Sequence, residues 1–335
     1  MAPARALWFT GPRTPELRQE EIAEAGPGQV TVRGVASLVS AGTEMLVYRG
    51  DLPAEDELGL ETCAGSFGFP VKYAYQIVGR VEAAGEGVPF APGDLVFCRH
   101  PHQERFTMRY VDWLIFKIPD GLDPERAIFS NLLDVALNCN LDVPVRHGDV
   151  VVVYGQGIVG SMCAQLARRT AGRIVVVDPA ANRREFALTW GADAAVEPQA
   201  ALETVMELSG GRGADVAIEA SGSPPALQSA IVATGQEGTI TAVSFFGNRT
   251  VPLVLSPEFH YRRQRLISSQ VSTIGSGLQP RWSLERRMAT VFDLLRDERL
   301  RTPISHRLAF ADAPEAYRLL DEEAETTMGV ALNYE

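Results

Sequence analysis

Residues 151–169 read VVVYGQGIVGSMCAQLARR and contain the pattern that decides the fold class of this chain. An apolar run that ends at residue 154 predicts a buried strand, and the amphipathic stretch after residue 158 predicts a helix. Between them stand Gly155, Gly157 and Gly160, spaced as G-x-G-x-x-G. A strand, a glycine turn and a helix in this order predict a dinucleotide-binding unit.

Each glycine of this turn has its own predicted role. Gly155 makes the sharp turn, Gly157 lets a pyrophosphate approach the backbone, and Gly160 lets the helix pack closely on the strand. Ile158 and Val159 open the helix, so their backbone N–H groups lie at its positive end, where phosphates bind. The alternative is a structural glycine turn without a ligand.

The second predicted strand ends in Asp178, 18 positions after Gly160. An acidic residue at this distance accepts hydrogen bonds from a ribose 2′-hydroxyl and repels a 2′-phosphate. Asp178 therefore favours NAD over NADP as the cofactor. Arg183 and its neighbour Arg184 follow closely enough to weaken this preference.

From residue 118 to about 282 the pattern alternates strands with helices, which predicts a doubly wound parallel sheet. The expected strands are 150–154, 173–177, 194–196, 215–219 and 238–243, and the expected helices lie near 158–171, 180–190, 199–209 and 224–234. Ligands of open α/β sheets gather at the carboxyl ends of the strands. The loop residues expected there to contact the cofactor are Ala220, Ser221, Ser244, Phe245 and Phe246, with core packing as the alternative for the two phenylalanines.

The first 117 residues instead carry short β-type runs separated by turn signals, which predict an antiparallel barrel or sandwich. Examples are QVTVRGVASLV at 29–39 and DLVFC at 94–98. After residue 283 a mixed helix and strand pattern returns, and we expect this tail to fold back onto the first domain. The predicted domains are therefore 1–117 with 283–335, and 118–282.

Composition excludes several classes of partner. The 335 residues carry a formal net charge of −11, which disfavours nucleic acid and anionic membranes as partners. We expect neither a secretory signal nor a membrane span, because no apolar run is long enough. The four cysteines are widely spaced and form no C-x-x-C pair, which favours a reducing cytoplasm.

Several segments together resemble the medium-chain dehydrogenase/reductase superfamily, in the family's own order. They are AGTEMLVYRG at 41–50, VGRVEAAGEGV at 78–88, PGDLVF at 92–97, YGQGIVG at 154–160, GADVAIEASG at 213–222 and APEAYRLL at 313–320. The resemblance implies a GroES-like β-barrel catalytic domain, a Rossmann domain, a dehydrogenase activity and a homodimer. Within that superfamily, the motifs of this chain resemble those of the zinc-type alcohol and polyol dehydrogenases.

The zinc-binding motifs of that family are altered in this sequence. The metal cysteine of C-G-T-D corresponds to Ala41, the histidine of G-H-E-x-x-G to Tyr75, and the third ligand to Asn131. None of these is a good zinc ligand, so we predict an enzyme without zinc. The alternative alignment would use Cys98, His100 and His102 as ligands.

Without a metal, side-chain donors must stabilise the charge that develops on the substrate oxygen. Tyr75 is the candidate general acid and base, or else a wall of the pocket. Thr43 matches the hydroxyl that relays protons in zinc alcohol dehydrogenases, or else is structural. Glu44 matches an acid that orients the site and is expected to be a buried partner. Gln76 and Asn131 are candidate amide donors, and His102 is a candidate for substrate contact or proton transfer.

The sequence therefore predicts a zinc-independent, NAD(H)-dependent oxidoreductase that interconverts a secondary alcohol and a ketone. The A-G-T-E loop is also similar to the bacteriochlorophyllide a dehydrogenase branch, so the small-molecule substrate is a polyol, a cyclitol or a specialised metabolite. Two alternatives stay open. One is an enoyl or quinone reductase of the same superfamily, and the other is a non-catalytic dinucleotide-binding sensor.

Overall fold

The computed structural model describes residues 2–63 and 65–334, and the chain divides into two compact units. Unit 1 comprises Met1–Asn131, Met288–Asp297 and Ile304–Glu335. Unit 2 comprises Leu132–Arg287 and Glu298–Pro303. Each unit is described separately below.

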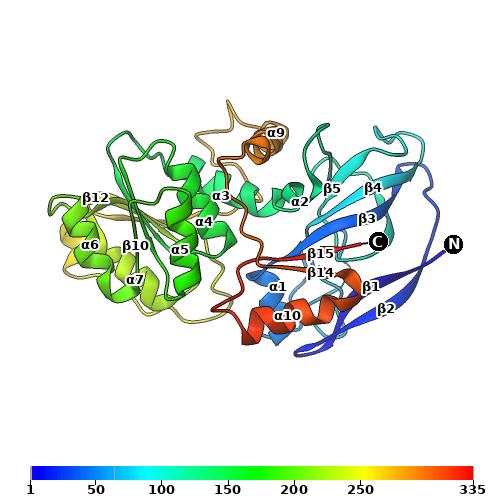
Figure 1. Ribbon diagram of the computed structural model, residues 1–335, viewed down its shortest axis with the longest axis horizontal. Helices are drawn as coiled ribbons and strands as arrows, with labels where there is room; N and C mark the ends of the chain where they lie inside the picture. Colours follow the sequence, from blue (N-terminus) through cyan, green and yellow to red (C-terminus); the bar gives the residue numbers. More distant parts are fainter. Residues whose placement is uncertain (1, 64, 335) are drawn as a thin grey trace. The chain divides into compact units, whose positions relative to one another are not determined.

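Unit 1 is built on antiparallel strands, as the N-terminal pattern predicted (Figure 1). β1 (Ala2–Gly11) and β2 (Thr14–Ile22) form a hairpin ribbon. The larger sheet contains β3 (Gln29–Val39), β4 (Ile77–Ala84), β5 (Leu95–Cys98), β6 (Arg105–Arg109), β7 (Ile115–Lys117), β14 (His306–Ala309) and β15 (Val330–Asn333). β15 pairs antiparallel with β3, so the C-terminal tail joins the N-terminal sheet as expected.

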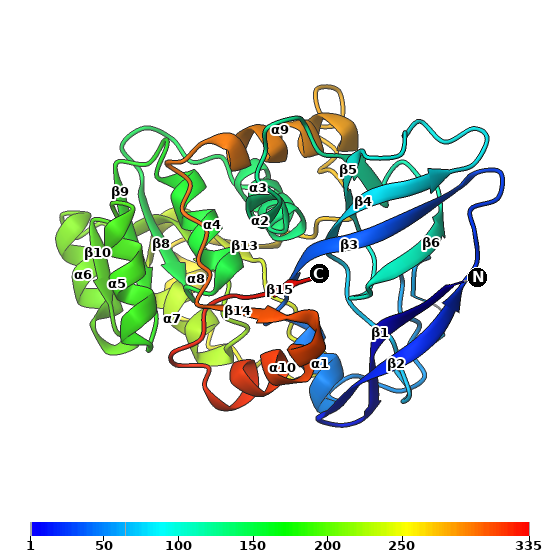
Figure 2. The ribbon, with the colours of Figure 1, turned by 45° about the vertical axis from the view of Figure 1, so that its right-hand side comes forward.

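Two apolar clusters hold this sheet together because alternate residues of its strands face inward. One cluster contains Val32 of β3, Val81 of β4 and Val96 of β5. The other joins the sheet to two helices, α1 (Thr43–Arg49) and α10 (Ala313–Glu322), which appear together in Figure 2. Unit 1 also contains α2 (Pro124–Ala127), η2 (Phe310–Asp312) and most of α9 (Leu284–Arg296).

Unit 2 is the predicted doubly wound parallel sheet, so the α/β fold class is confirmed. Among the described residues its strand order is β10-β9-β8-β11-β12-β13. The strands are β8 (Val150–Tyr154), β9 (Arg173–Val177), β10 (Ala194–Val196), β11 (Ala214–Glu219), β12 (Thr234–Ala242) and β13 (Arg265–Ser268). The sixth strand, β13, was not predicted, because its four residues are mostly exposed and show no apolar alternation.

The crossover helices of unit 2 lie where the glycine and apolar patterns place them. They are α4 (Ile158–Ala167), α5 (Ala181–Thr189), α6 (Ala201–Leu208) and α7 (Pro224–Ala233), with the short η1 (Pro198–Ala200) and α8 (Glu258–Tyr261). α6 and α7 pack on the sheet through Val205, Leu227 and Ile231, all buried. β8 is buried along its whole length, as expected for a central parallel strand.

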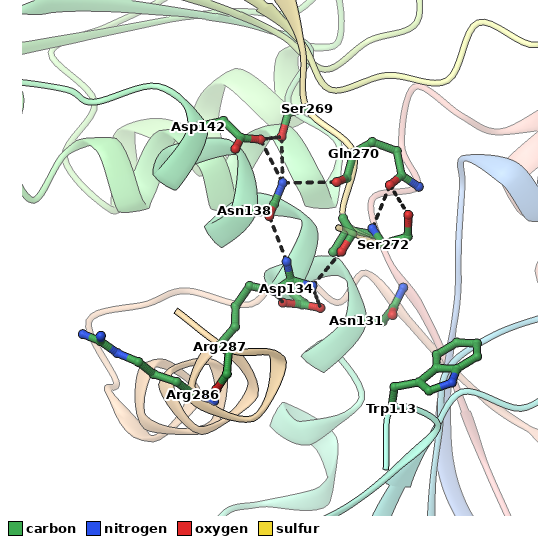
Figure 3. A network of polar contacts seen from close by, with 12 residues as sticks. Trp113, Asn131, Asp134, Asn138, Asp142, Ser269, Gln270, Ser272, Arg286 and Arg287 are labelled. Atoms are coloured by element: carbon green, nitrogen blue, oxygen red, sulfur yellow. Dashed lines mark hydrogen bonds and ion pairs between the residues drawn. The ribbon is translucent and has the colours of Figure 1, made fainter. Parts of the chain in front are cut away.

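A buried polar network holds α3 (Ser130–Asp142) through Asp134, Asn138 and Asp142, which belong to unit 2 (Figure 3). Arg287, almost fully buried, donates to Asp134 at 2.6 and 3.1 Å and to Asn138 at 2.8 Å. Asn138 in turn donates to Asp142 at 2.9 Å, and Ser269 donates to Asp142 at 2.7 Å. Burial of these charges is tolerated because nearly every polar atom has a partner.

In the described part of the chain, no helix has the length and apolarity that crossing a membrane requires.

Candidate active site

The glycine turn of unit 2 has the geometry of a phosphate cradle. A Cβ on Gly160 would lie 1.9 Å from the carbonyl oxygen of Gly155, so only glycine lets α4 approach β8 this closely. A Cβ on Gly157 would meet no atom within 4 Å, which leaves open space at the start of α4. The first N–H groups of this ten-residue helix therefore border a space that an anion can enter.

Asp178 is buried directly after β9 and lies against the glycine turn. Its Oδ2 accepts the backbone N–H of Gln156 at 2.7 Å, and its Oδ1 accepts that of Ala180 at 2.9 Å. A carboxylate has about four acceptor sites, so both oxygens keep capacity for a further donor. The Gln156 side-chain oxygen is buried and has no partner among the described residues.

The two arginines that follow Asp178 differ in their contacts. Arg184 donates to the carbonyl oxygens of Asp178 and Pro179 at 2.8 and 2.7 Å, and pairs with Glu197 at 3.0 Å. Its guanidinium therefore binds backbone carbonyls at the end of β9. The Arg183 guanidinium lies 3.7 Å from the Asp178 carboxylate.

A second carboxylate, Glu219, ends β11 and was not singled out from the sequence. Its Oε1 accepts the backbone N–H and the hydroxyl of Ser221 at 2.7 and 2.6 Å, and the N–H of Gly222 at 2.9 Å. Ser244 accepts the same Gly222 N–H at 2.8 Å, which joins two of the predicted cofactor loops. The Glu219 Oε2 is buried without a partner among the described residues, at the sheet edge where ligands bind.

The remaining predicted cofactor residues occupy different surroundings. Ile158 is buried in the first turn of α4, and Val159 and Ala220 are partly exposed. Phe246 packs on the core of unit 2, whereas the side chain of Phe245 is 58% exposed. Phe245 and Phe246 therefore have different surroundings, although the sequence predicted the same contact with the cofactor for both.

In unit 1, the first turn of α1 positions Glu44 inside the protein. Its side chain is fully buried, and its Oε2 accepts the Tyr317 hydroxyl at 2.8 Å and pairs with His102 Nε2 at 3.1 Å. Its Oε1 accepts the backbone N–H of Ser40 at 3.2 Å. Burial, followed by the charge of Glu44, raises the pKa of Tyr317, so this hydroxyl stays protonated as a donor.

Tyr75 lies beside this carboxylate network. Its hydroxyl donates to the Ser40 Oγ at 2.5 Å, and it also has a side-chain hydrogen bond with Thr43. Burial is the largest effect that raises the pKa of Tyr75, and the negative charge of Glu44 adds to it. The hydrogen bonds with Ser40 and Thr43 lower the pKa but only partly offset the rise, so the phenol is held protonated.

The other positions of the altered metal motifs have well-defined contacts. Ala41 is exposed and offers no side-chain donor atom. The Asn131 Oδ1 accepts Arg99 Nε at 3.0 Å, and Arg99 Nη1 donates to the Trp113 carbonyl at 2.6 Å. Gln76 is fully buried, and its amide donates to the carbonyl of Leu38 at 2.7 Å. The Gln76 Oε1 has no partner among the described residues.

The alternative ligand set of Cys98, His100 and His102 is not assembled. Cys98 lies in an apolar cluster, and burial raises the pKa of its thiol. His100 stacks on Phe106 with ring centroids 3.7 Å apart, and burial lowers its pKa to about 3. His102 is buried against Glu44. Over residues 2–63 and 65–334, no cluster of three His, Cys, Asp or Glu side chains could hold a metal ion.

Four residues of these networks were not among the predicted site residues: Ser40, Arg99, Tyr317 and Glu219. Ser40 directly precedes the A-G-T-E loop, and Glu219 and Tyr317 stand inside segments that resemble the family. Their positions were visible in the sequence. Their contacts were not, because Tyr317 and Glu44 are 273 residues apart.

The fold and the glycine cradle are typical of a dinucleotide-binding protein, and comparison with known proteins indicates a dehydrogenase. A family model described as zinc-binding dehydrogenase matches residues 159–292. The D-guloside 3-dehydrogenase of Shigella flexneri is 29% identical over 98% of this chain and 100% of its own length. The sorbitol dehydrogenase of Halalkalibacterium halodurans is 24% identical, covering 94% of this chain and 96% of that protein.

A solved structure shows the same fold. It is a putative zinc-binding dehydrogenase from Sinorhizobium meliloti 1021 bound to NADP, with a TM-score of 0.79 and 20% identity. The alignment covers 99% of this chain and 100% of that one. Over nearly its whole length the chain is thus similar to zinc-type alcohol and polyol dehydrogenases of the medium-chain dehydrogenase/reductase superfamily. Enzymes of this family use a dinucleotide cofactor.

Proposed function

We propose that this enzyme interconverts a secondary alcohol and a ketone without zinc, with the Tyr75 hydroxyl as the proton donor to the reacting oxygen. The observation that carries the proposal is the hydrogen-bonded chain from Tyr75 to Ser40 beside the buried Glu44 carboxylate. Tyr75 stands where relatives with a catalytic zinc have a histidine ligand.

Zinc independence rests on the chemistry of the donor set. Zinc requires imidazole, thiolate or carboxylate ligands at about 2.0–2.3 Å. Ala41 supplies no donor atom, the Tyr75 phenol is not one of the usual zinc ligands, and the Asn131 oxygen accepts from a guanidinium. The positive charge of Arg99 at this position further disfavours a dication. These residues do not fit a catalytic zinc ion.

The proton path follows from the contacts of Tyr75. In the reductive direction the Tyr75 hydroxyl gives its proton to the oxygen of the former carbonyl. Solvent water then returns a proton to the phenolate, and the hydroxyl of Ser40 or of Thr43 passes it on. Glu44 receives the Ser40 backbone N–H and so positions Ser40 for this relay. The bound dinucleotide supplies or accepts the hydride.

The cradle of unit 2 suits NAD. The N–H groups at the start of α4 would hold the pyrophosphate beside Gly157. The buried Asp178 carboxylate would accept a ribose hydroxyl and would repel a 2′-phosphate. Arg183 opposes this preference for NAD. Its guanidinium lies 3.7 Å from Asp178, where its positive charge would attract a 2′-phosphate. Replacement of Asp178 by Asn removes the negative charge that repels a 2′-phosphate. The KM for NADPH is therefore expected to fall relative to the KM for NADH.

We infer a polyol, cyclitol or sugar-derived substrate. The names of the two curated relatives, D-guloside 3-dehydrogenase and sorbitol dehydrogenase, favour this class.

The proposal includes a homodimer in the cytoplasm. β13 is an edge strand of the unit 2 sheet, and nearby Tyr261 and Leu266 are 74% and 37% exposed. An edge strand with exposed apolar side chains is suited to pairing with a second copy. The four cysteines are free and buried, which suits a reducing compartment. Light scattering of wild-type and Leu266→Glu protein would test the dimer.

A substrate panel tests the proposed reaction. Saturated hydroxyketones and activated enones are each supplied with NADH and with NADPH, and turnover is measured for wild-type and Tyr75→Phe enzyme. The proposal expects turnover of a hydroxyketone with NADH and its loss in Tyr75→Phe. Turnover of enones alone would identify an enoyl or quinone reductase. Tight NADH binding without any turnover, unaffected by Tyr75→Phe, would identify a non-catalytic sensor.

A further inference from the structure

Glu219 ends β11 at the point where the strand order of unit 2 changes direction. From β8, the sheet adds β9 and β10 on one side, and β11, β12 and β13 on the other. β11 pairs directly with β8, and Glu219 lies opposite Tyr154. Ligands of open α/β sheets bind in the crevice that such a reversal creates at the carboxyl ends of the strands. Glu219 therefore stands at the edge of the dinucleotide crevice.

The turn after Glu219 lies against the glycine turn after β8. A Cβ on Gly155 would be 2.8 Å from the backbone nitrogen of Ser221, so a side chain at Gly155 would force these two turns apart. The Glu219 carboxylate shapes its own turn, because its Oε1 accepts the N–H and the hydroxyl of Ser221 and the N–H of Gly222. A shift of this carboxylate would therefore move a turn that touches the phosphate cradle.

The charge of Glu219 has no counter-ion within the protein. Its side chain is fully buried and forms no ion pair with any of the residues that the structure describes. The three donors on its Oε1 are neutral, so they stabilise the carboxylate but leave its net charge in place. Arg249 donates to the Gly222 carbonyl at 3.1 Å, but it is exposed, so solvent screens its charge. A buried charge without a counter-ion attracts a positive group of a bound ligand.

Asp178 and Glu219 belong to different halves of the sheet. A doubly wound sheet binds one mononucleotide on each half. Asp178 follows β9, where an acidic residue receives the ribose of the adenosine. The half that contains β11 to β13 is then left for the nicotinamide nucleotide. The nicotinamide ring is the part of the cofactor whose charge changes, since it is positive in NAD⁺ and neutral in NADH.

We propose that Glu219 is a positioning residue for the nicotinamide half of the cofactor, and that its charge favours NAD⁺ over NADH. The turn at Ser221 and Gly222 acts on both forms alike, because both carry the same pyrophosphate and riboses. The carboxylate charge attracts only the oxidised ring, and it acts through space without a direct contact. This inference rests on the proposed use of NAD, but not on the substrate or on the role of Tyr75.

Calorimetric titrations with NAD⁺ and with NADH test the proposal without any turnover. The measured quantity is the Kd for NADH divided by the Kd for NAD⁺. Glu219→Gln keeps the shape of the side chain and an acceptor for the turn but removes the charge, so this ratio is expected to fall about fivefold. Glu219→Asp keeps the charge but shortens the side chain, so both constants are expected to rise together while the ratio stays close to that of the wild type.

Asp215→Asn is the matched control. Asp215 lies at the opposite end of β11, and its Oδ2 also accepts a backbone N–H, that of Val150 at 2.8 Å. About 13 Å of extended strand separates it from Glu219. Both dissociation constants of this variant should therefore equal those of the wild type.

The thermal midpoint of each variant shows that it is folded, and Glu219→Ala removes the same charge if the Gln variant is unstable. A wild-type ratio in the neutral variants would overturn the proposal, since a purely structural role changes both constants alike. An equal fall of the ratio in Asp215→Asn would also overturn it, because net charge alone would then be responsible. Failure of the wild type to bind either form would instead refute the dinucleotide cradle, and this inference with it.

Discussion

The glycine cradle of unit 2 and the polar network around Glu44 in unit 1 depend on different parts of the chain. The cradle is made of backbone, and its three glycines keep the geometry that a dinucleotide needs. In unit 1 the side chains at the altered motif positions have other partners, since Tyr75 donates to Ser40 and Asn131 accepts from Arg99. The cradle therefore depends on the absence of side chains at its glycines, whereas the chemistry of the unit 1 site depends on which side chains are present.

The strongest test of the rebuilt side-chain site is Tyr75→Phe. Loss of a positioned proton donor is expected to lower kcat by about 10²–10⁴-fold, with a small change in KM. Tyr73→Phe is the matched control, because Tyr73 is a buried tyrosine whose ring packs edge-on against that of Tyr75 at 5.9 Å. Steady-state kinetics of the two variants checks the prediction. Equal losses in both would show that packing, and not the Tyr75 hydroxyl, is responsible.

The backbone site is tested by Gly157→Val. A side chain at Gly157 meets no protein atom within 4 Å, and its φ of −65° suits any residue, so the fold should be retained. The valine would occupy the space of the pyrophosphate, and NADH binding is expected to weaken by about 100-fold, or 2.8 kcal/mol. Fluorescence titration measures the affinity. Unchanged affinity at an unchanged thermal midpoint would contradict the cradle.

Glu44→Gln tests whether the charge of Glu44 stabilises unit 1 and raises the pKa of Tyr75. The amide keeps the shape of the carboxylate but not its charge or its full acceptor capacity, so unfolding should become easier by about 1–3 kcal/mol. Because the charge of Glu44 contributes to the raised pKa of Tyr75, its removal should lower that pKa. Denaturant unfolding and the pH profile of alcohol oxidation measure the two effects. A profile that does not move to lower pH would argue against coupling between Glu44 and Tyr75.

The smallest expected effect is the pH dependence of the wild-type enzyme. In the proposed mechanism, oxidation of the alcohol needs a Tyr75 phenolate to accept the proton, and the raised pKa keeps this form scarce near neutrality. The kcat/KM for oxidation should therefore rise with pH through the alkaline range, while reduction should stay nearly constant until Tyr75 begins to ionise. Paired pH profiles in both directions check this. A rise that persists in Tyr75→Phe would assign it to another group.

Much of the fold could be predicted from the sequence, because it is encoded by local patterns. The segments that form β8 to β12 are apolar and bounded by turns. The spacing of Gly155, Gly157 and Gly160 places them between a strand and a helix, where they lie between β8 and α4. β13 could not be predicted, since its pairing with β12 and not an apolar pattern makes it a strand.

The site was only partly predictable for a related reason. Tyr75, Thr43 and Glu44 could be nominated from their place in the motifs. The contacts of Glu44 with His102 and Tyr317 join residues far apart in the chain, which no spacing rule reveals. The fates of Phe245 and Phe246 also depend on tertiary packing, because both residues are equally apolar.

Metal removal tests the central claim, that protein side chains and not zinc stabilise the reacting oxygen. Enzyme dialysed against a strong zinc chelator is assayed for ketone reduction with NADH, and its zinc content is measured by elemental analysis in the same sample. The account predicts full turnover at substoichiometric zinc and no gain when zinc is added back. Loss of turnover on chelation, with recovery on addition of one zinc per chain, would contradict it.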